Sequence, residues 1–457
     1  MQEDLHFFHQ LADEIVKKED ENPVVKPIDP EKLFDEIDLE LAQDGISDDH
    51  LKELLRQVVF NTPKTTTDKF FNQLFGGRNA KATLGELLAV MLNTSMYTYK
   101  VGGVQVGIEK EIIHKVCSLV NYPETADGTL APGGSMCNFM ALLMARDSVN
   151  RNIKTEGVQQ KMTMYTSEES HYSITKNAMF SGLGIDQIRR IATDDRGRML
   201  ADELDAQIQI DQQNGYVPTF VNATAGTTVL GAFDPVDKIA DVTKKHNIWL
   251  HVDGAYCGSV IFSNKYKHLV EGLEKSDSFC FNAHKMLNTP LSCSILVTQK
   301  KHNLKHSFAC DANYLYQTDE DEYNLGKTSL QCGRRNDALK FWVLWKSVGS
   351  KGLEKMVNQQ FDLAESARDY IRNHNDYTLY SYENSISVCF NYKDVDPKII
   401  CNQLYKEGEL MIGYGSYEGT EFVRLVTINS SNSEKEIFNF FKILENFAEK
   451  ELLALNA

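Results

Sequence analysis

The sequence lacks any uninterrupted apolar run of the roughly 18 residues that a membrane-spanning helix requires. Its longest candidate, LGELLAVML, is much shorter and carries Glu86, so no transmembrane helix is expected. The first residues, MQEDLHFFHQLADE, contain neither a basic segment nor an apolar stretch of the kind found in a secretory signal peptide. We therefore expect a cytoplasmic protein.

Cysteine pairs and an excess of basic residues are also missing. The nine cysteines form no CxxC motif, and in a chain of this length they indicate reduced thiols rather than a disulfide framework. Histidine and cysteine show no zinc-binding spacing, so we expect no metal site. The 64 acidic and 48 basic residues give a net charge of −16, which argues against nucleic acid or an anionic membrane as a partner.

The chain has 457 residues, 42% hydrophobic and 25% charged, which suits a large globular domain with a smaller one. Residues 1–60 read as charged helical segments interrupted by prolines, and a charged amphipathic helix of this kind is most often either solvated or packed on another subunit. We expect three parts: an N-terminal helical segment packing on a partner subunit, a large domain and a small C-terminal domain. Their expected bounds are 1–60, 61–338 and 339–457.

Between about residues 110 and 300, short apolar runs alternate with amphipathic helical stretches. The apolar runs are MTMYTS, IRRIAT, PTFVNAT, IWLHVD and SFCFN. This alternation indicates βαβ units and a mainly parallel sheet, in which ligands bind beyond the carboxyl ends of the strands. Further on, YTLYSYENSISVCFNY alternates like antiparallel strands with one solvated face, so we expect a smaller α+β domain there.

Polar side chains stand at three of these strand ends. Asp253 closes IWLHVD, Lys285 follows FCFNAH, and Thr224 closes FVNAT. Only one connection separates Asp253 from Lys285, so both side chains can meet at one edge of the sheet. A buried structural ion pair explains this spacing as well as a functional site does.

A cofactor gives the sharper explanation. A lysine in a desolvated site has a lowered amine pKa and can form a Schiff base. Pyridoxal phosphate needs such a lysine, a carboxylate near its ring nitrogen and a site for its phosphate. Gly133, Gly134 and Ser135 in APGGSMCNFM open an apolar helix, whose N-terminus favours anions. Taken alone these residues indicate a plain turn, but together with Asp253 and Lys285 they favour the cofactor.

Several segments resemble the group II pyridoxal-phosphate-dependent amino-acid decarboxylases, most closely the glutamate and cysteine-sulfinate (aspartate) decarboxylase branch. They occur in the family's order from about residue 60 to 430, as PGGSMCN, HYSITKNA, HVDGAYCG, NAHKML, LQCGRR and FVRLV. The resemblance implies an α/β protein of PLP-transferase fold type I, aspartate aminotransferase-like. It has a large domain with a mainly parallel sheet flanked by helices and a smaller α+β C-terminal domain. It also implies a homodimer with the active site at the interface, to which NTSMYTYKV would contribute.

The resemblance assigns roles around the cofactor pyridoxal 5'-phosphate. Lys285 would join it covalently, Asp253 would pair with its ring nitrogen, and His171 would stack on the ring. Tyr323, in the stretch ANYLYQTDEDEYNLGKTSLQCGRR that resembles the mobile catalytic loop, would donate a proton. The remaining positions expected near the cofactor ring or its phosphate are Gly134, Ser135, Thr224, Ala255, Asn282 and His284.

Three positions resemble substrate-binding residues. Arg424 in FVRLV would bind the α-carboxylate, a task that suits a bidentate guanidinium. Gln73 in FFNQLFGG would lie near the substrate carboxylate, and the bulk of Phe75 would shorten the pocket. A shortened pocket suits aspartate or cysteine sulfinate. Lys100, Gly102 and Gly103 depart from the residues usual after TY in this family.

The resulting expectation is a carboxy-lyase that decarboxylates an acidic L-amino acid to the amine and CO2. Cysteine sulfinate, aspartate and glutamate are the expected substrates, while an aromatic or diamino acid is the alternative. A pyridoxal-phosphate transaminase, or a protein that keeps the fold without the chemistry, also stays open. Release of CO2 distinguishes a decarboxylase from a transaminase.

Overall fold

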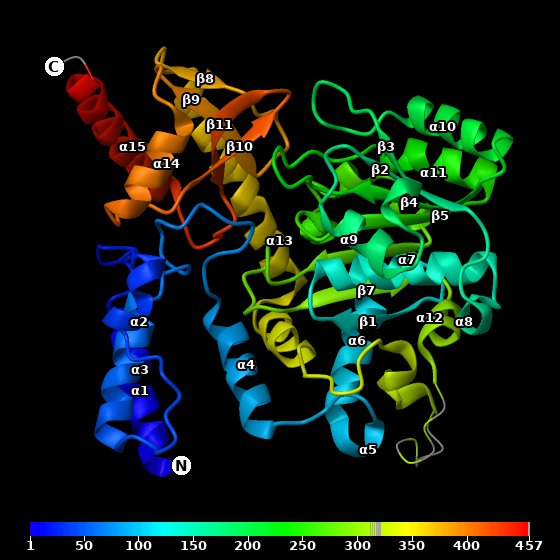
Figure 1. The fold of residues 1–457 in the computed structure, drawn as a ribbon, viewed down its shortest axis with the longest axis horizontal. Coiled ribbons are helices and arrows are strands. Elements are labelled where there is room, and N and C mark those ends of the chain that lie inside the picture. The colour runs from blue at the N-terminus through cyan, green and yellow to red at the C-terminus, as the bar shows by residue number, and fades with distance from the viewer. Residues whose placement is uncertain (311, 313, 315, 317–320, 456–457) are drawn as a thin grey trace. The chain divides into compact units, whose positions relative to one another are not determined.

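The computed structural model describes residues 1–310, 312, 314, 316 and 321–455 of the chain (Figure 1). Two compact units are present. The first comprises residues 1–77, 363–381 and 387–457, and the second residues 78–362 and 382–386. These units follow other bounds than the expected segments 1–60, 61–338 and 339–457, so that division, including the packing of residues 1–60 on a partner subunit, stays a prediction.

A seven-stranded sheet forms the centre of the second unit, in the order β1-β7-β6-β5-β4-β2-β3. Strands β2 to β6 pair in parallel with their neighbours, whereas β7 is antiparallel to both β6 and β1. The strands are β1 (Asp127–Ala131), β2 (Met162–Ser167), β3 (Ile188–Ile191), β4 (Val217–Thr224), β5 (Trp249–Gly254), β6 (Ser278–Asn282) and β7 (Ser294–Thr298).

Every residue of β2, β5, β6 and β7 is buried. Helices therefore cover these strands, as parallel sheets require, and near-continuous apolar runs such as SFCFN are the sequence counterpart. The helices of this unit are α4 (Ala80–Leu92), α5 (Tyr99–Gly102), α6 (Val104–Leu119), α7 (Gly134–Val149), α8 (Ile153–Glu156), α9 (Ser173–Phe180), α10 (Ala201–Gln213), α11 (Val236–His246) and α12 (Lys301–Phe308).

Helix α7 packs on β4, β5, β6 and β7 (Figure 1). Its apolar residues, including Met140 and Met144, share a core with Phe220, Trp249 and Leu296. This packing brings the N-terminus of α7 to the sheet, which positions the site described below. Helix α13 (Ala338–Arg372) then runs through a kink at Gly349, where φ is 67°.

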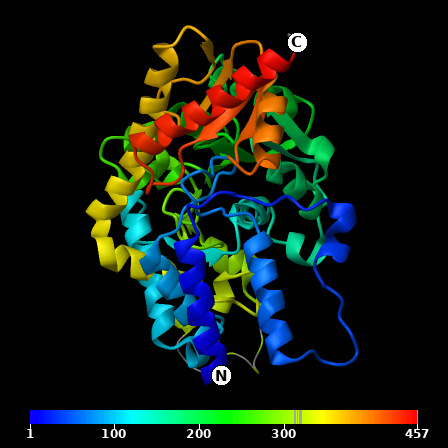
Figure 2. The same cartoon turned by 90° about the vertical axis from the view of Figure 1, so that its left-hand side faces the viewer.

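The first unit contains a four-stranded antiparallel sheet in the order β10-β11-β9-β8. Helix α15 lies over these strands beside α14, as Figure 2 shows in red and orange, and its Phe440 and Phe441 share a core with Phe390 and Val423. The elements are α1 (Gln2–Lys17), α2 (Leu33–Glu36), α3 (Asp48–Asn61), β8 (Tyr377–Leu379), β9 (Ser387–Tyr392), α14 (Pro397–Lys406), β10 (Gly413–Tyr417), β11 (Thr420–Val426) and α15 (Glu434–Leu455).

The mainly parallel sheet with flanking helices and the smaller α+β part confirm the expected fold class. In β10, the exposed residues Tyr414 and Ser416 alternate with less exposed ones, as expected for a strand with one solvated face. All nine cysteines are free thiols. Within the described residues, no helix is long and apolar enough to cross a membrane, and the same part of the chain holds no group of His, Cys, Asp and Glu side chains arranged to bind a metal.

Candidate functional site

The carboxyl ends of β4, β5 and β6 border a pocket of about 250 Å³. This volume admits a small aromatic molecule rather than only a water. Eight of the residues singled out in the sequence line it together: Gly134, Ser135, His171, Thr224, Asp253, Ala255, Asn282 and Lys285.

Strand pairing explains why Asp253 and Lys285 share this pocket. Strands β5 and β6 are parallel neighbours, with Asp253 opposite Cys280. The turn after β6 is closed by the Lys285 N–H, which donates to the carbonyl of Asn282 at 3.1 Å. Both side chains therefore stand at the same carboxyl edge, where α/β sheets bind their ligands.

The carboxylate of Asp253 is buried, with 3% of the residue exposed. Its Oδ1 accepts a hydrogen bond from the Ala255 N–H at 3.0 Å, and its Oδ2 accepts one from Asn138 Nδ2 at 2.7 Å. Two such donors offset much of the cost of burying the charged form. Asp253 is thus held as an acceptor facing the pocket.

The amine of Lys285 is buried beside this carboxylate. Burial lowers the pKa of Lys285, and the nearby charge of Asp253 opposes that shift without cancelling it. The ammonium lies 5.8 Å from the centroid of the Tyr256 ring. A lowered pKa raises the fraction of neutral amine, which is the nucleophilic form.

His171 lies just before α9 and lines the same pocket. Its Nδ1 accepts a hydrogen bond from the Ser173 N–H at 3.2 Å, so the proton of the neutral ring is on Nε2. Burial lowers the pKa of His171, which favours the neutral imidazole. A neutral ring is suited to stacking on an aromatic ligand.

The N-terminus of α7 closes the other side of the pocket. At Gly134 a Cβ atom would lie 2.7 Å from the Cβ of Ala255 and 3.2 Å from Asn282 Nδ2, so only glycine allows this close approach. Gly133, the N-cap, has a φ of 138°, which also favours glycine. The first N–H groups of this 16-residue helix are therefore available to an anion.

These residues fit pyridoxal phosphate. The pocket combines a buried amine, an acceptor carboxylate and a helix N-terminus. In addition, the buried Oδ1 of Asn282 has no hydrogen-bond partner in the described part of the chain. Unsatisfied buried polar atoms are rare, and a bound ligand is one way to satisfy them. An amide can turn to present either its oxygen or its nitrogen.

Asp234 fixes the end of β4 from outside the pocket. Its Oδ2 accepts a hydrogen bond from the Thr224 N–H, and its Oδ1 accepts one from the Met199 N–H, both at 2.7 Å. Burial raises the pKa of Asp234 to about 7. The sequence reasoning did not single out this residue, which holds Thr224 in place.

Two of the residues predicted for catalysis or cofactor binding do not line the pocket as the described residues define it. His284 is turned to the backbone of Cys293, whose N–H donates to its Nδ1 at 2.8 Å, and burial lowers the pKa of His284 to about 4. Tyr323, at the end of η6 (Asp321–Tyr323), packs with its ring centroid 5.4 Å from that of Tyr99. Their expected roles stay predictions. Residues 313, 315 and 317–320 of the predicted catalytic loop lie outside the described residues.

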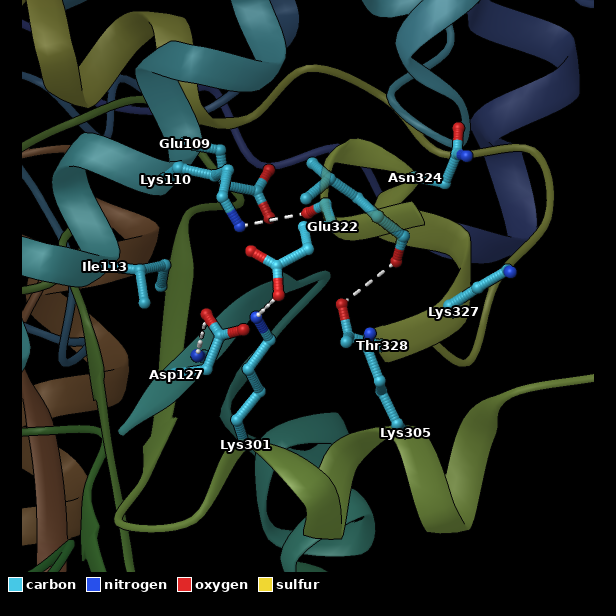
Figure 3. Close-up of a pocket in the computed structure, with 12 residues that line it drawn as sticks. Glu109, Lys110, Ile113, Asp127, Lys301, Lys305, Glu322, Asn324, Lys327 and Thr328 are labelled. Atoms are coloured by element: carbon cyan, nitrogen blue, oxygen red, sulfur yellow. Dashed lines mark hydrogen bonds and ion pairs between the residues drawn. The ribbon is translucent and has the colours of Figure 1, made fainter. Parts of the chain in front are cut away.

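Lysines surround the segment that carries Tyr323. Figure 3 shows Lys110 and Lys301 pointing toward Glu322. Lys110 donates to the Glu322 carbonyl at 3.0 Å, and Lys301 pairs with its carboxylate at 2.5 Å. The adjoining cavity measures about 10 Å³, room for about one water, so it is not a substrate site.

The three predicted substrate residues belong to the first unit. Arg424, on β11, lies opposite Gly413 and donates from Nη2 to the carbonyl of Asn72 at 3.1 Å. Asn72 directly precedes Gln73, which is exposed. Phe75 packs on Phe70 with ring centroids 5.8 Å apart. The structure thus joins Arg424 to the FFNQLFGG segment, and their roles in substrate binding stay predictions.

Sequence reasoning missed five residues that line the pocket: Asn138, Tyr172, Gly226, Thr228 and Tyr256. Asn138 stands four positions after Gly134 on α7, a spacing that returns to the same helix face and was therefore a usable signal. Tyr256 directly follows Ala255, and no periodicity marks it.

Comparison with known proteins agrees with this geometry. The family model described as "Pyridoxal-dependent decarboxylase conserved domain" matches residues 30–393. The chain is 39% identical over 427 residues to the cysteine sulfinic acid decarboxylase of Rattus norvegicus, covering 88% of this chain and 86% of that protein. It is 37% identical over 434 residues to the acidic amino acid decarboxylase GADL1 of Mus musculus, covering 89% and 78%.

A solved structure supports the same assignment. The crystal structure of mouse CSAD matches with a TM-score of 0.92 at 35% identity, over 96% of both chains. The resemblance seen in the sequence, fold type I and the cofactor are thereby confirmed. The chain belongs to the family of pyridoxal-dependent decarboxylases, and it is a carboxy-lyase that uses pyridoxal phosphate.

Proposed function

We propose that this enzyme removes the α-carboxylate of an acidic L-amino acid, with cysteine sulfinate, aspartate and glutamate as the candidates. The single observation that carries the chemistry is the pocket that joins the buried amine of Lys285 to the acceptor carboxylate of Asp253. The similarity to decarboxylases named for cysteine sulfinic acid and acidic amino acids supports the choice of substrate.

Lys285 acts first, because its depressed pKa supplies a neutral amine that can bond covalently to the cofactor aldehyde. When bound, pyridoxal phosphate supplies a sink for the electron pair that remains on the substrate as CO2 leaves. Asp253 holds a proton on the ring nitrogen, since a carboxylate with two N–H donors stays an acceptor. His171, whose lowered pKa favours the neutral imidazole, would stack on the cofactor ring.

The remaining predicted residues handle the substrate. Arg424 binds the α-carboxylate through its guanidinium and orients the bond that breaks. Gln73 contacts the substrate carboxylate, and Phe75 limits the length of the side chain that fits. Tyr323 delivers the proton to Cα after CO2 has left, while the chain around it excludes water. Gly134, Ser135, Asn282 and His284 bind the phosphate, and Thr224 and Ala255 contact the cofactor.

The active enzyme is a homodimer in the cytoplasm. Helix α4 exposes six large apolar side chains, which a second copy of the chain would cover: Leu84, Leu87, Leu88, Val90, Met91 and Leu92. Nine free thiols suit a reducing compartment. Sedimentation of the purified holoenzyme measures its oligomeric state, and the unchanged enzyme is expected to be a dimer. Leu88→Glu places a charge on the exposed apolar face of α4 and is expected to give monomers.

The test of the substrate is a panel of amino acids assayed for CO2 release with added pyridoxal phosphate. Cysteine sulfinate, aspartate and glutamate are expected to react with higher kcat/KM than tyrosine, tryptophan or 2,4-diaminobutyrate. Preference for an aromatic or diamino acid would overturn the acidic assignment. Amino-group transfer to a keto acid without CO2 release would overturn the reaction.

A further inference from the structure

Four buried side chains lie under Asp253, on the side of the sheet that faces α7. Trp249, His251 and Asp253 alternate along β5 and so point to one face. On β6, Ser278 stands opposite His251 in the parallel register. Asn138 reaches the same face from α7, and none of these residues is more than 8% exposed.

Hydrogen bonds join these residues in one continuous chain. Trp249 Nε1 donates to Ser278 Oγ at 2.9 Å, and the same Oγ lies 2.9 Å from His251 Nδ1. On the other side of the ring, His251 Nε2 lies 3.0 Å from Asn138 Oδ1. Asn138 Nδ2 then donates to Asp253 Oδ2 at 2.7 Å.

One direction along these hydrogen bonds uses every donor. The Trp249 indole N–H can only donate, so it occupies one lone pair of Ser278 Oγ, and the hydroxyl proton is used when it is donated to His251 Nδ1. In this arrangement Nδ1 accepts, and Nε2 carries the proton that is donated to Asn138 Oδ1. Burial lowers the pKa of His251 to about 4, so the ring is neutral near pH 7.

The amide of Asn138 passes this direction on to Asp253. With its oxygen turned to His251 Nε2 and to the thiol of Cys280 at 3.4 Å, its two N–H groups point to Asp253 and to Ser173 Oγ at 3.2 Å. The opposite direction would turn the amide round and set its oxygen against the carboxylate. Only a protonated Asp253 could donate a hydrogen bond to that oxygen.

We propose that Trp249, Ser278, His251 and Asn138 are positioning residues that lock Asp253 as an acceptor-only carboxylate for the ring nitrogen of pyridoxal phosphate. The tautomer of His251 and the ionisation of Asp253 are then linked through one amide group. This inference rests on the proposed function only in the role given to Asp253.

A matched pair of serines tests the chain in the holoenzyme. Ser278→Ala removes the link between Trp249 and His251. Ser276→Ala is the control. Ser276 is also buried, but its hydroxyl bonds to the Tyr122 hydroxyl at 2.7 Å and takes no part in the hydrogen bonds that lead to Asp253. Ser278→Ala is expected to raise the dissociation constant of pyridoxal phosphate about tenfold, as loss of outer-shell partners does at metal sites. Ser276→Ala is expected to change this dissociation constant by no more than about twofold. The two variants are expected to lose similar amounts of thermal stability.

A second pair varies the imidazole. His251→Leu is expected to weaken cofactor binding and to shift the ¹⁵N resonance of bound [¹⁵N]pyridoxal phosphate from the pyridinium toward the pyridine value. His251→Gln restores both, because its side-chain N–H can still donate to Asn138 Oδ1. The proposal would be overturned if Ser278→Ala and Ser276→Ala bound pyridoxal phosphate with equal dissociation constants. It would also be overturned if both His251 variants bound the cofactor as tightly as the unchanged enzyme.

One measurement needs no variant and therefore does not depend on folding of a mutant. In ¹⁵N-histidine-labelled enzyme, His251 is expected as the Nε2–H tautomer, and the Nδ1–H tautomer would overturn the inference. The substrate proposal fails separately, when the unchanged enzyme binds pyridoxal phosphate but releases no CO2 from acidic amino acids.

Discussion

Asn138 Nδ2 and Asp253 Oδ2 meet at 2.7 Å in the wall of the pocket that Lys285 also lines. A helix that contributes its N-terminus to an anion site thus also contributes, one turn later, the donor for the buried carboxylate. The same packing of α7 on β5 and β6 serves both purposes, so one helix fixes both the proposed phosphate end and the proposed ring-nitrogen end of the pocket.

Replacing Lys285 by alanine is expected to abolish the visible absorption of the bound cofactor and to reduce CO2 release more than a hundredfold. Removing a buried amine takes away a desolvation cost, so thermal stability should not fall. Absorption spectra and a CO2 assay check this. Lys285→Arg keeps the charge but cannot form the bond, and retained absorption in that variant would contradict the role of the amine.

Asp253→Asn keeps the shape of the side chain but removes its charge. The ring nitrogen would lose its acceptor for a proton, so kcat is expected to fall by about 10²–10⁴, the range of a proton-handling group. The fold should survive, because the Asn Oδ1 can still accept from the Ala255 N–H. Steady-state kinetics and circular dichroism measure the two effects. A variant with normal kcat would remove Asp253 from the mechanism.

Stability is expected to fall below pH 6.5 because His284 is buried as a neutral ring. Its folded pKa is about 4, against about 6.5 in an unfolded chain. The unfolded state therefore binds the proton first, and stability that is complete above pH 6.5 is lost as the pH falls toward 4. The loss for this group is ~3 kcal/mol at its limit.

Urea denaturation between pH 4 and 8 measures that loss. His284→Gln should make the stability profile flatter, although His251, with a pKa also lowered to about 4, keeps part of the slope. His114→Gln is the control, because the His114 side chain is 71% exposed. An unchanged slope in His284→Gln would show that this ring does not titrate as burial implies.

The parallel core could be predicted because each buried strand is a short apolar run followed by an amphipathic helix. Asp253 and Lys285 were foreseen for the same reason, since a charged residue at the end of a buried strand needs an explanation. Strand β7 was not foreseen: SILVT is buried throughout, and nothing local tells an antiparallel neighbour from a parallel one.

Non-local packing accounts for the rest of what the sequence did not reveal. Phe71 belongs to the core of the C-terminal strands, a contact across more than 300 residues that no window of sequence contains. Asn138 was quoted within PGGSMCN, but its importance depends on which face of α7 meets β5. His284 adjoins Lys285 in sequence and turns instead toward Cys293, because successive residues in the turn after β6 point in different directions.

Two ion pairs of this enzyme are expected to differ in their effect on folding. Glu322 and Lys301, drawn in Figure 3, are 63% and 31% exposed, and solvent and salt screen such a pair. Glu109 and Arg334 are each 3% exposed, so removing the carboxylate would leave a buried, unpaired guanidinium. Glu109→Ala should therefore lower the free energy of unfolding by about 3 kcal/mol. Glu322→Ala should leave it at the wild-type value within error.

Chemical denaturation of both variants at low and high salt measures the difference. The loss in Glu109→Ala should persist at 0.5 M salt, because a buried pair is screened little. Glu109 also accepts from the Leu130 N–H at 3.2 Å, so β1 next to the diglycine turn loses a second contact. A salt-sensitive loss in Glu109→Ala, or a large loss in Glu322→Ala, would mean that burial does not decide the strength of these pairs.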